Sequence, residues 1–155
     1  MFENIMKMVI PKSIVSKTFN FLQRHGKDGK EAHAVLAGFK ENQTFVITHV
    51  LFPKQNNSTY TYEVLDGEDH KINVEMYKLG IIAIAQIHTH PANAYHSSID
   101  DDGSVLVLPG SFSIVIPDYG YINKMDINNW AVYRYIDLKW KWISNYKKKK
   151  MICIK

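Results

Sequence analysis

At the centre of the chain stands the segment Ile81-Ile82-Ala83-Ile84-Ala85-Gln86-Ile87-His88-Thr89-His90-Pro91. Its first seven residues are almost all apolar and do not alternate with polar ones, a pattern typical of a central strand covered on both faces. Proline then ends the strand. Residues two apart on a strand share a face, so the imidazoles of His88 and His90 are expected to converge at its carboxyl end, where sites in α/β sheets commonly lie.

Two neutral imidazoles aimed at one point make half of a zinc site. The run Ser98-Ile99-Asp100-Asp101 is typical of a helix start, with Ser98 as N-cap and Asp101 in the first turn, which would return a carboxylate to the strand end. His88, His90 and Asp101 would leave a fourth position for water, as in catalytic zinc sites. Ser-x-x-Asp alone is a common helix cap, and an isolated His-x-His is most often incidental. The proline and the fixed gap between the two halves make the pattern specific.

Other metal sites that begin with His-x-His do not fit the sequence. A metallo-β-lactamase pattern needs an acid where Ala92 stands, and a cupin needs a glutamate that is absent between His90 and Ser98. A nucleobase deaminase needs paired cysteines near its zinc, whereas Cys153 is the one cysteine of the chain.

Taken together, these residues resemble the motif of the JAMM (JAB1/MPN/Mov34) metalloproteases, which cut isopeptide bonds to ubiquitin and ubiquitin-like proteins. That motif has an upstream glutamate, then His-[Ser/Thr]-His-Pro, then Ser-x-x-Asp, and every spacing from His88 to Asp101 agrees with it. The segment Glu31-Ala32-His33-Ala34-Val35-Leu36-Ala37-Gly38 fits the family pattern around the glutamate. The segment from Phe45 to Gln55 is similar to AMSH-type deubiquitinases, and the resemblance covers roughly Met8 to Asp118.

The resemblance implies an α/β fold: a single JAB/MPN (cytidine-deaminase-like) domain with a mixed β-sheet flanked by helices. It also implies one catalytic Zn²⁺ ion held by His88, His90 and Asp101. Glu31 would take a proton from the metal-bound water and pass it to the departing amine. Ser98 would donate a hydrogen bond to the oxyanion, a role that can coexist with its role as a helix cap.

Neighbouring side chains offer alternative ligands for the metal. Asp100 and Asp102 flank Asp101, but only Asp101 has the family spacing from Ser98, and the other two are typical first-turn acids favoured by the helix dipole. His96 is a conceivable ligand, although the family has none at that position.

The departures from the AMSH-type pattern narrow the expected function. The chain lacks the added His and Cys ligands of a second, structural zinc, and it resembles the bacterial JAB proteins encoded beside ubiquitin-like, E1-like and E2-like partners in antiphage operons. This implies an isopeptidase that removes a ubiquitin-like tag or processes its precursor, in a groove that holds the substrate tail as an added strand. The alternative is a non-catalytic MPN scaffold that binds protein partners, although such relatives usually lack the metal residues.

The sequence predicts alternating strands and helices around the motif. On the strand from Glu31 to Phe39, residues 31, 33, 35 and 37 should share one face, where His33 is a neighbour or a structural histidine and not a ligand. Further strands are expected over residues 6–10, 44–52, 81–87, 112–116, 130–136 and 139–143. Helices are expected over residues 13–24, 66–79 and 98–108, and residues 53–61 form an exposed loop.

Composition predicts one domain for the 155 residues, with 46% hydrophobic and 22% charged side chains. The chain has no apolar run of eighteen residues, the first eight residues do not resemble a signal peptide, and a single cysteine excludes an internal disulfide framework. We therefore expect a cytoplasmic protein with no membrane partner.

The net charge of +4 is concentrated at the end of the chain. Residues 139–155 contain seven lysines and no acid, so residues 1–138 carry +4 − 7 = −3. We expect a JAB/MPN metalloprotease domain over residues 1–146 and a basic C-terminal tail over residues 147–155. Its run Lys147 to Lys150 could bind nucleic acid or another anionic surface, but a terminal run of lysines is more often a solvated, flexible end, which is the expectation here.

Overall fold

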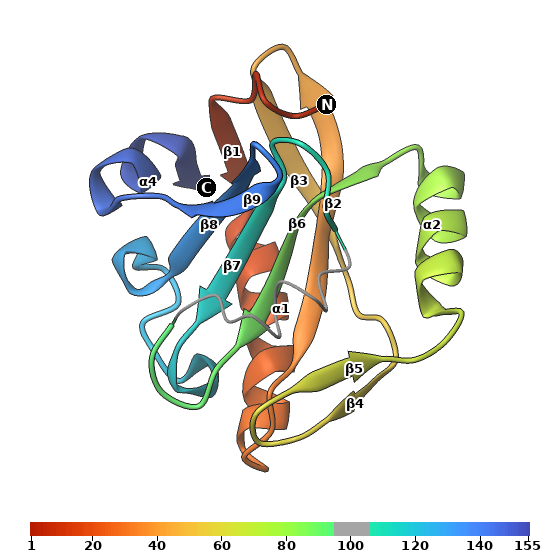
Figure 1. Cartoon of the computed structure of the whole chain (residues 1–155), viewed down its shortest axis with the longest axis vertical. Helices are drawn as coiled ribbons and strands as arrows, with labels where there is room; N and C mark the ends of the chain where they lie inside the picture. The colour runs from red at the N-terminus through yellow and green to blue at the C-terminus, as the bar shows by residue number, and fades with distance from the viewer. Residues whose placement is uncertain (95–105) are drawn as a thin grey trace.

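The computed structural model describes residues 1–94 and 106–155. In these residues eight strands form one mixed sheet in the order β10-β1-β3-β2-β6-β7-β8-β9 (Figure 1). The strands are β1 (Lys7–Ile10), β2 (His33–Glu41), β3 (Thr44–Leu51), β6 (Ile82–Thr89), β7 (Phe112–Ile116), β8 (Ala131–Ile136), β9 (Lys139–Trp142) and β10 (Ile152–Ile154). Two further strands, β4 (Gln55–Asn57) and β5 (Tyr62–Val64), form a separate small hairpin.

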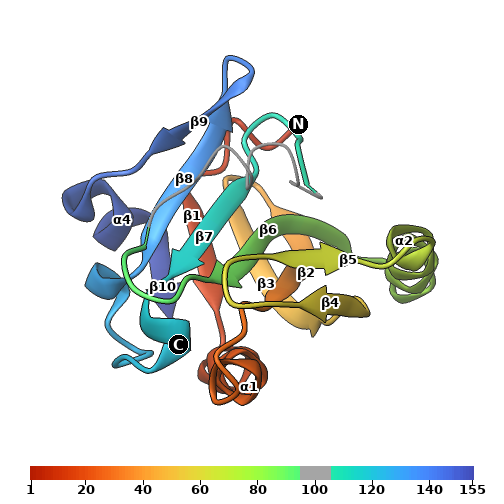
Figure 2. The same ribbon diagram turned by 60° about the horizontal axis from the view of Figure 1, so that its bottom comes forward.

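Helices cover the two faces of the main sheet. The helices are α1 (Lys12–Gly26), α2 (Glu68–Leu79) and α4 (Asn145–Met151), with short 3-10 turns η1 (Asp118–Gly120) and η2 (Ile127–Asn129). Figure 2 shows α1 beneath the sheet and α2 at its side, next to the β4-β5 hairpin. The expected mixed sheet flanked by helices is confirmed. No helix in the described residues is both long and apolar enough to cross a membrane.

The alternation predicted for β2 is borne out by two separate hydrophobic clusters. Ala32, Ala34 and Leu36 pack into the large core that contains the apolar stripe of α1. Val35 and Ala37 point the other way and pack with Ile72 and Met76 of α2 and with Leu51 and Ile81. The strand that begins beside Glu31 is therefore buried on both faces.

Gly38 in β2 lies directly against the backbone of the neighbouring strand β3. A Cβ atom at Gly38 would lie 1.8 Å from the carbonyl oxygen of Val46 in β3. The close approach is between two strands, at the bulge where the β2-β3 register shifts between Ala37 and Gly38.

Two predicted elements differ from the structure. Residues 106–108 are not helical, and the remainder of the helix expected over residues 98–108 falls outside the described residues. The exposed loop expected over residues 53–61 contains β4, which pairs in antiparallel register with β5. Hydrophobic periodicity gives no signal for β4 because all three of its residues are polar.

The basic C-terminal segment is part of the fold, so the prediction of a flexible tail over residues 147–155 does not match the structure. Strand β10 pairs in parallel with β1 at the edge of the sheet, and Ile152 lies in the large core. Lys148 is buried, and its ammonium donates to the carbonyl of Trp130. One lysine of the run therefore fastens α4 to the start of β8.

Candidate metal centre

His88 and His90 lie where the sequence predicts them, at the carboxyl end of β6. His88 pairs with His33 of β2 on one side and with Val115 of β7 on the other. The amide of His90 donates to the carbonyl of Ile116 at 2.9 Å. Both imidazoles are almost fully shielded from solvent, with exposed fractions of 0% and 5%. Their backbones are fixed by the sheet and not by a loop.

The two rings have the separation that a shared zinc ion requires. With Zn–N bonds of about 2 Å and tetrahedral angles, two imidazoles on one zinc have ring centres about 5 Å apart. The ring centres of His88 and His90 are 5.2 Å apart. Neutral imidazole is also a preferred zinc donor, so this pair fits the metal that the motif implies.

Glu31 lies just before β2, beside the two histidines. Its amide donates to the carbonyl of Ser58 at 2.7 Å, and its carbonyl accepts from the side-chain amide of Asn57 at 2.7 Å. His33 pairs with His88 in the antiparallel register of β2 and β6. Two residues earlier on one chain segment and two residues later on the other, the same register places Glu31 opposite His90, on the face that carries both histidines. Glu31 is buried, with an exposed fraction of 3% for the whole residue, so its carboxyl group lies inside the protein and not on the surface.

The remaining predicted site residues, Ser98 and Asp101, lie outside the described residues, as do Asp100, Asp102 and His96. Within residues 1–94 and 106–155 no group of three or more His, Cys, Asp or Glu side chains is placed to hold a metal. The described part of the centre is therefore the pair of imidazoles with Glu31 beside it, and the third ligand stays a prediction.

Aromatic rings continue from the histidine pair across the sheet face. The ring of Tyr62, on β5, stacks on His33 with centres 4.7 Å apart and tilts toward His88 at 5.5 Å. The side chain of Gln55 accepts from the amide of His33 and donates to its carbonyl, both at 2.8 Å. Sequence reasoning placed His33 beside the site but missed Tyr62 and Gln55. Gln55 lies in a wholly polar strand, and Tyr62 lies in a strand of only three residues, so neither segment gives a clear periodic signal.

His33 is held as a neutral imidazole. Burial lowers its pKa from 6.5 to about 3, and the neighbouring His88 acts in the same direction. A neutral ring has one N–H donor and one lone pair to offer. Tyr119 is a third residue near the site that sequence reasoning missed. Its amide donates to the carbonyl of His90 at 2.9 Å, and its hydroxyl lies 3.1 Å from the carbonyl oxygens of Gly29 and Thr59, either of which can accept its hydrogen bond.

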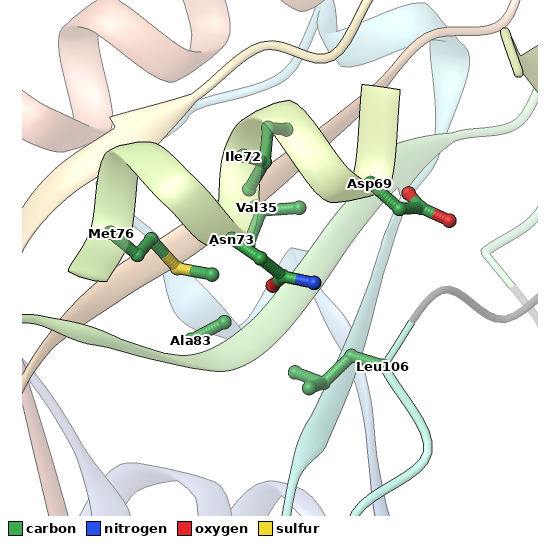
Figure 3. Close-up of a pocket in the computed structure, with 7 residues that line it drawn as sticks. All are labelled: Val35, Asp69, Ile72, Asn73, Met76, Ala83 and Leu106. Carbon is green, nitrogen blue, oxygen red and sulfur yellow. The ribbon is translucent and has the colours of Figure 1, made fainter. Parts of the chain in front are cut away.

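A pocket of about 220 Å³ opens on the same sheet face, between α2 and β6 (Figure 3). Val35, which lines the pocket, pairs with Gln86 in the β2-β6 register. This pair is two residues from the His33-His88 pair, which corresponds to about 7 Å along the strands. Figure 3 shows side chains of α2 facing those of β2 and β6 across this space. The pocket is lined by Val35, Asp69, Ile72, Asn73, Met76, Ala83 and Leu106. A second pocket of about 340 Å³ shares Asn73, Met76, Ala83 and Leu106 with it and is almost wholly apolar.

Sequence comparison relates the chain to metalloproteases. No family model matches it. The probable metalloprotease y4jG of Sinorhizobium fredii is 33% identical over 144 residues, which cover 90% of this chain and 88% of that protein. The STAM-binding protein of Rattus norvegicus is 32% identical over 117 residues, which cover 73% of this chain but only 27% of that longer protein.

Structural comparison gives the same fold. A JAB1/MPN domain protein from Archaeoglobus fulgidus superposes with a TM-score of 0.53 over 97% of this chain and 98% of that protein. The two sequences are 14% identical, so this likeness concerns the fold alone.

Proposed function

The chain belongs to the JAMM/MPN metalloprotease family, and from this premise we propose that it is a zinc-dependent isopeptidase or peptidase acting on a ubiquitin-like protein. The observation that carries the proposal is the buried pair His88 and His90, with ring centres 5.2 Å apart and Glu31 beside them. His88, His90 and Asp101 would hold the zinc ion, with Glu31 as general base and Ser98 as a donor to the oxyanion.

The chemistry divides between the metal and the chain. Bound zinc would lower the pKa of water to about 7 and polarise the scissile carbonyl. Glu31 would accept a proton from the attacking water and deliver it to the departing amine nitrogen, which in an isopeptide is a lysine side chain. Because hydrogen bonds from Asn57 and to Ser58 fix its main chain, Glu31 enters the reaction with its backbone already positioned.

The groove formed by the two pockets supports an extended peptide as substrate. It runs along β6 beside α2, on the face that carries the histidines, and its lining is mostly apolar. A substrate tail lying in the groove with its carboxyl end at His88 would place its apolar side chains against Ile72 and Met76. This is the arrangement expected for the extended C-terminal tail of a ubiquitin-like protein.

We extend the proposal to the biological setting that the sequence resemblance implies, a bacterial ubiquitin-like conjugation system of the antiphage type with E1-like and E2-like partners. The match to the metalloprotease of Sinorhizobium fredii over nearly its full length supports a compact enzyme of the bacterial kind. A more distant relative, the AMSH-like ubiquitin thioesterase 3 of Arabidopsis thaliana, is 27% identical over 110 residues and supports a link to ubiquitin-related proteins.

The test compares the wild-type protein with Glu31→Gln, which keeps the size and shape of the side chain but cannot accept the proton. Zinc content after dialysis should be about one ion per chain in both proteins. Cleavage of an isopeptide-linked ubiquitin dimer, and of a ubiquitin-like protein with a short C-terminal extension, should fall at least about 100-fold in the variant. Glu41→Gln, at the exposed end of β2, is the matched control and should cleave like the wild type.

Equal activity of Glu31→Gln and wild type would contradict the assignment of the base. Zinc binding by the wild type without cleavage of any substrate of this class would favour the non-catalytic scaffold instead. Failure to bind zinc at all would overturn the proposed metalloprotease.

A further inference from the structure

His33 is a polar side chain in a setting that does not satisfy it. Its exposed fraction is 0%, and neither ring nitrogen has a hydrogen-bond partner in the described residues. Buried imidazole nitrogens normally bond to protein or to ordered water, and an exception calls for an explanation. Apolar side chains of similar size would fill the same space without this cost.

The position of His33 points to its partner. It stands directly opposite His88 in the β2-β6 register, on the face that carries the candidate metal centre. Side chains at directly opposed positions of antiparallel strands have Cβ atoms about 4.5–5.5 Å apart. Two imidazoles at this separation can be joined directly or through one water molecule.

The surroundings of His33 hold its ring in place. Tyr62 stacks on it at 4.7 Å with an interplanar angle of 10°, and Gln55 bonds to both main-chain groups of the residue. Gln55 also accepts from the side-chain amide of Asn57, which donates to the carbonyl of Glu31. The polar strand β4 thus braces both His33 and the residue expected to act as base.

We propose that His33 is a positioning residue that orients His88 for metal binding, by accepting on one ring nitrogen the N–H of His88 that faces away from the metal. The inference rests on the proposed function, since it assigns His88 as a ligand. Histidine ligands of metals almost always donate their second ring N–H to an acceptor, which fixes their tautomer and orientation. A neutral imidazole fills this role without burying a further charge beside the site.

Two kinds of substitution separate hydrogen bonding from packing. His33→Phe keeps an aromatic ring against Tyr62 but has no acceptor. His33→Asn and His33→Gln lose the ring but supply an accepting carbonyl oxygen. In Asn this oxygen lies about where Nδ1 of His33 was, and in Gln about where Nε2 was. Loss of such a partner typically weakens metal binding about 10–100-fold. We expect that loss in His33→Phe, with affinity largely recovered in one of the two amide variants.

Zinc dissociation constants are measured by competition with a chromogenic chelator, with thermal unfolding of the metal-free proteins to show that each variant is folded. His70→Leu, an exposed histidine on α2, is the control for unspecific loss of zinc. Nitrogen-15 NMR of labelled histidine gives a second readout: in the zinc-loaded wild type His88 should show one metal-bound nitrogen and one N–H protected from exchange, and this protection should be lost in His33→Phe.

Tighter zinc binding by His33→Phe than by both amide variants would overturn the inference in favour of a packing role. So would equal affinity in the wild type and all variants, and in that case the proposed function would stand. Absence of zinc binding by the wild type would overturn both.

Discussion

Ala32 and Thr89 are joined by two hydrogen bonds at the edge of the candidate site. The amide of Ala32 donates to the hydroxyl of Thr89 at 3.0 Å, and the amide of Thr89 donates to the carbonyl of Ala32 at 3.1 Å. Thr89 stands between the two histidines and Ala32 directly follows Glu31. This link therefore sets the distance between the expected base and the expected ligands, and it explains why a hydroxyl is useful between the histidines.

Replacement of Thr89 by valine should separate these two parts of the site. The substitution keeps the shape of the side chain but leaves the buried amide of Ala32 without its acceptor, which typically costs about 1–3 kcal/mol of unfolding free energy. Because Glu31 moves with Ala32, we expect kcat to fall while KM stays within a few-fold. Urea unfolding and steady-state kinetics measure the two effects. Thr89→Ser retains the hydroxyl and should recover most of both, and a kcat equal to wild type in Thr89→Val would show that the link does not position Glu31.

Much of the site's frame can be predicted because it depends on short-range patterns. The apolar run before His88 identifies a strand covered on both faces, and the period of two along β2 separates Val35 from Ala34 and Leu36 correctly. Both are properties of neighbouring residues that every strand shares.

The parts that were missed depend on single contacts between distant residues. Strand β4 is defined by polar side chains whose partners lie elsewhere: Gln55 bonds to His33, which is 22 residues away. Lys148 is buried because Trp130, 18 residues earlier, offers it a carbonyl, and no property of a lysine run indicates which lysine will find such a partner. Neither contact has a periodic signature.

The stability of the metal-free protein should depend on pH through His33. Its pKa is lowered from 6.5 to about 3 in the folded state, so below pH 6.5 the unfolded chain binds a proton that the folded chain does not. Stability from this source is complete above about pH 6.5 and is lost as the pH falls toward 3, by at most roughly 1.4 kcal/mol per pH unit. Urea unfolding of wild type and His33→Phe at pH 7.5, 6 and 5 measures it. The variant should lose less stability than the wild type over this range, and parallel losses would contradict the prediction.

Truncation after Tyr146 should destabilise the whole domain. It removes β10 from the edge of the sheet, Ile152 from the core and the ammonium that binds the carbonyl of Trp130. We expect a loss of about 3 kcal/mol or more in unfolding free energy, measured by urea denaturation. Lys147→Glu and Lys149→Glu change the charge of exposed positions and should each alter stability by no more than about 0.5 kcal/mol. A truncated protein as stable as the wild type would support the flexible tail.

Because truncation is expected to destabilise the domain, binding of the lysine run to nucleic acid is tested with Lys147→Glu and Lys149→Glu and not by truncation.

Filling the pocket between α2 and β6 should weaken substrate binding more than the chemical step. Ala83 lines both pockets, and a phenylalanine there would occupy space that an apolar side chain of the substrate tail is proposed to use. Because Ala83 lies five residues before His88 on β6, it would contact the tail away from the scissile bond, and we expect Ala83→Phe to raise KM about tenfold with kcat changed less than threefold. Val74→Phe adds the same ring to α2 at an exposed position that lines neither pocket, and it should leave both constants unchanged. Zinc content and thermal unfolding of both variants establish that the metal centre and the fold are intact. An unchanged KM in a folded, zinc-loaded Ala83→Phe would contradict the proposal that the substrate tail uses this pocket.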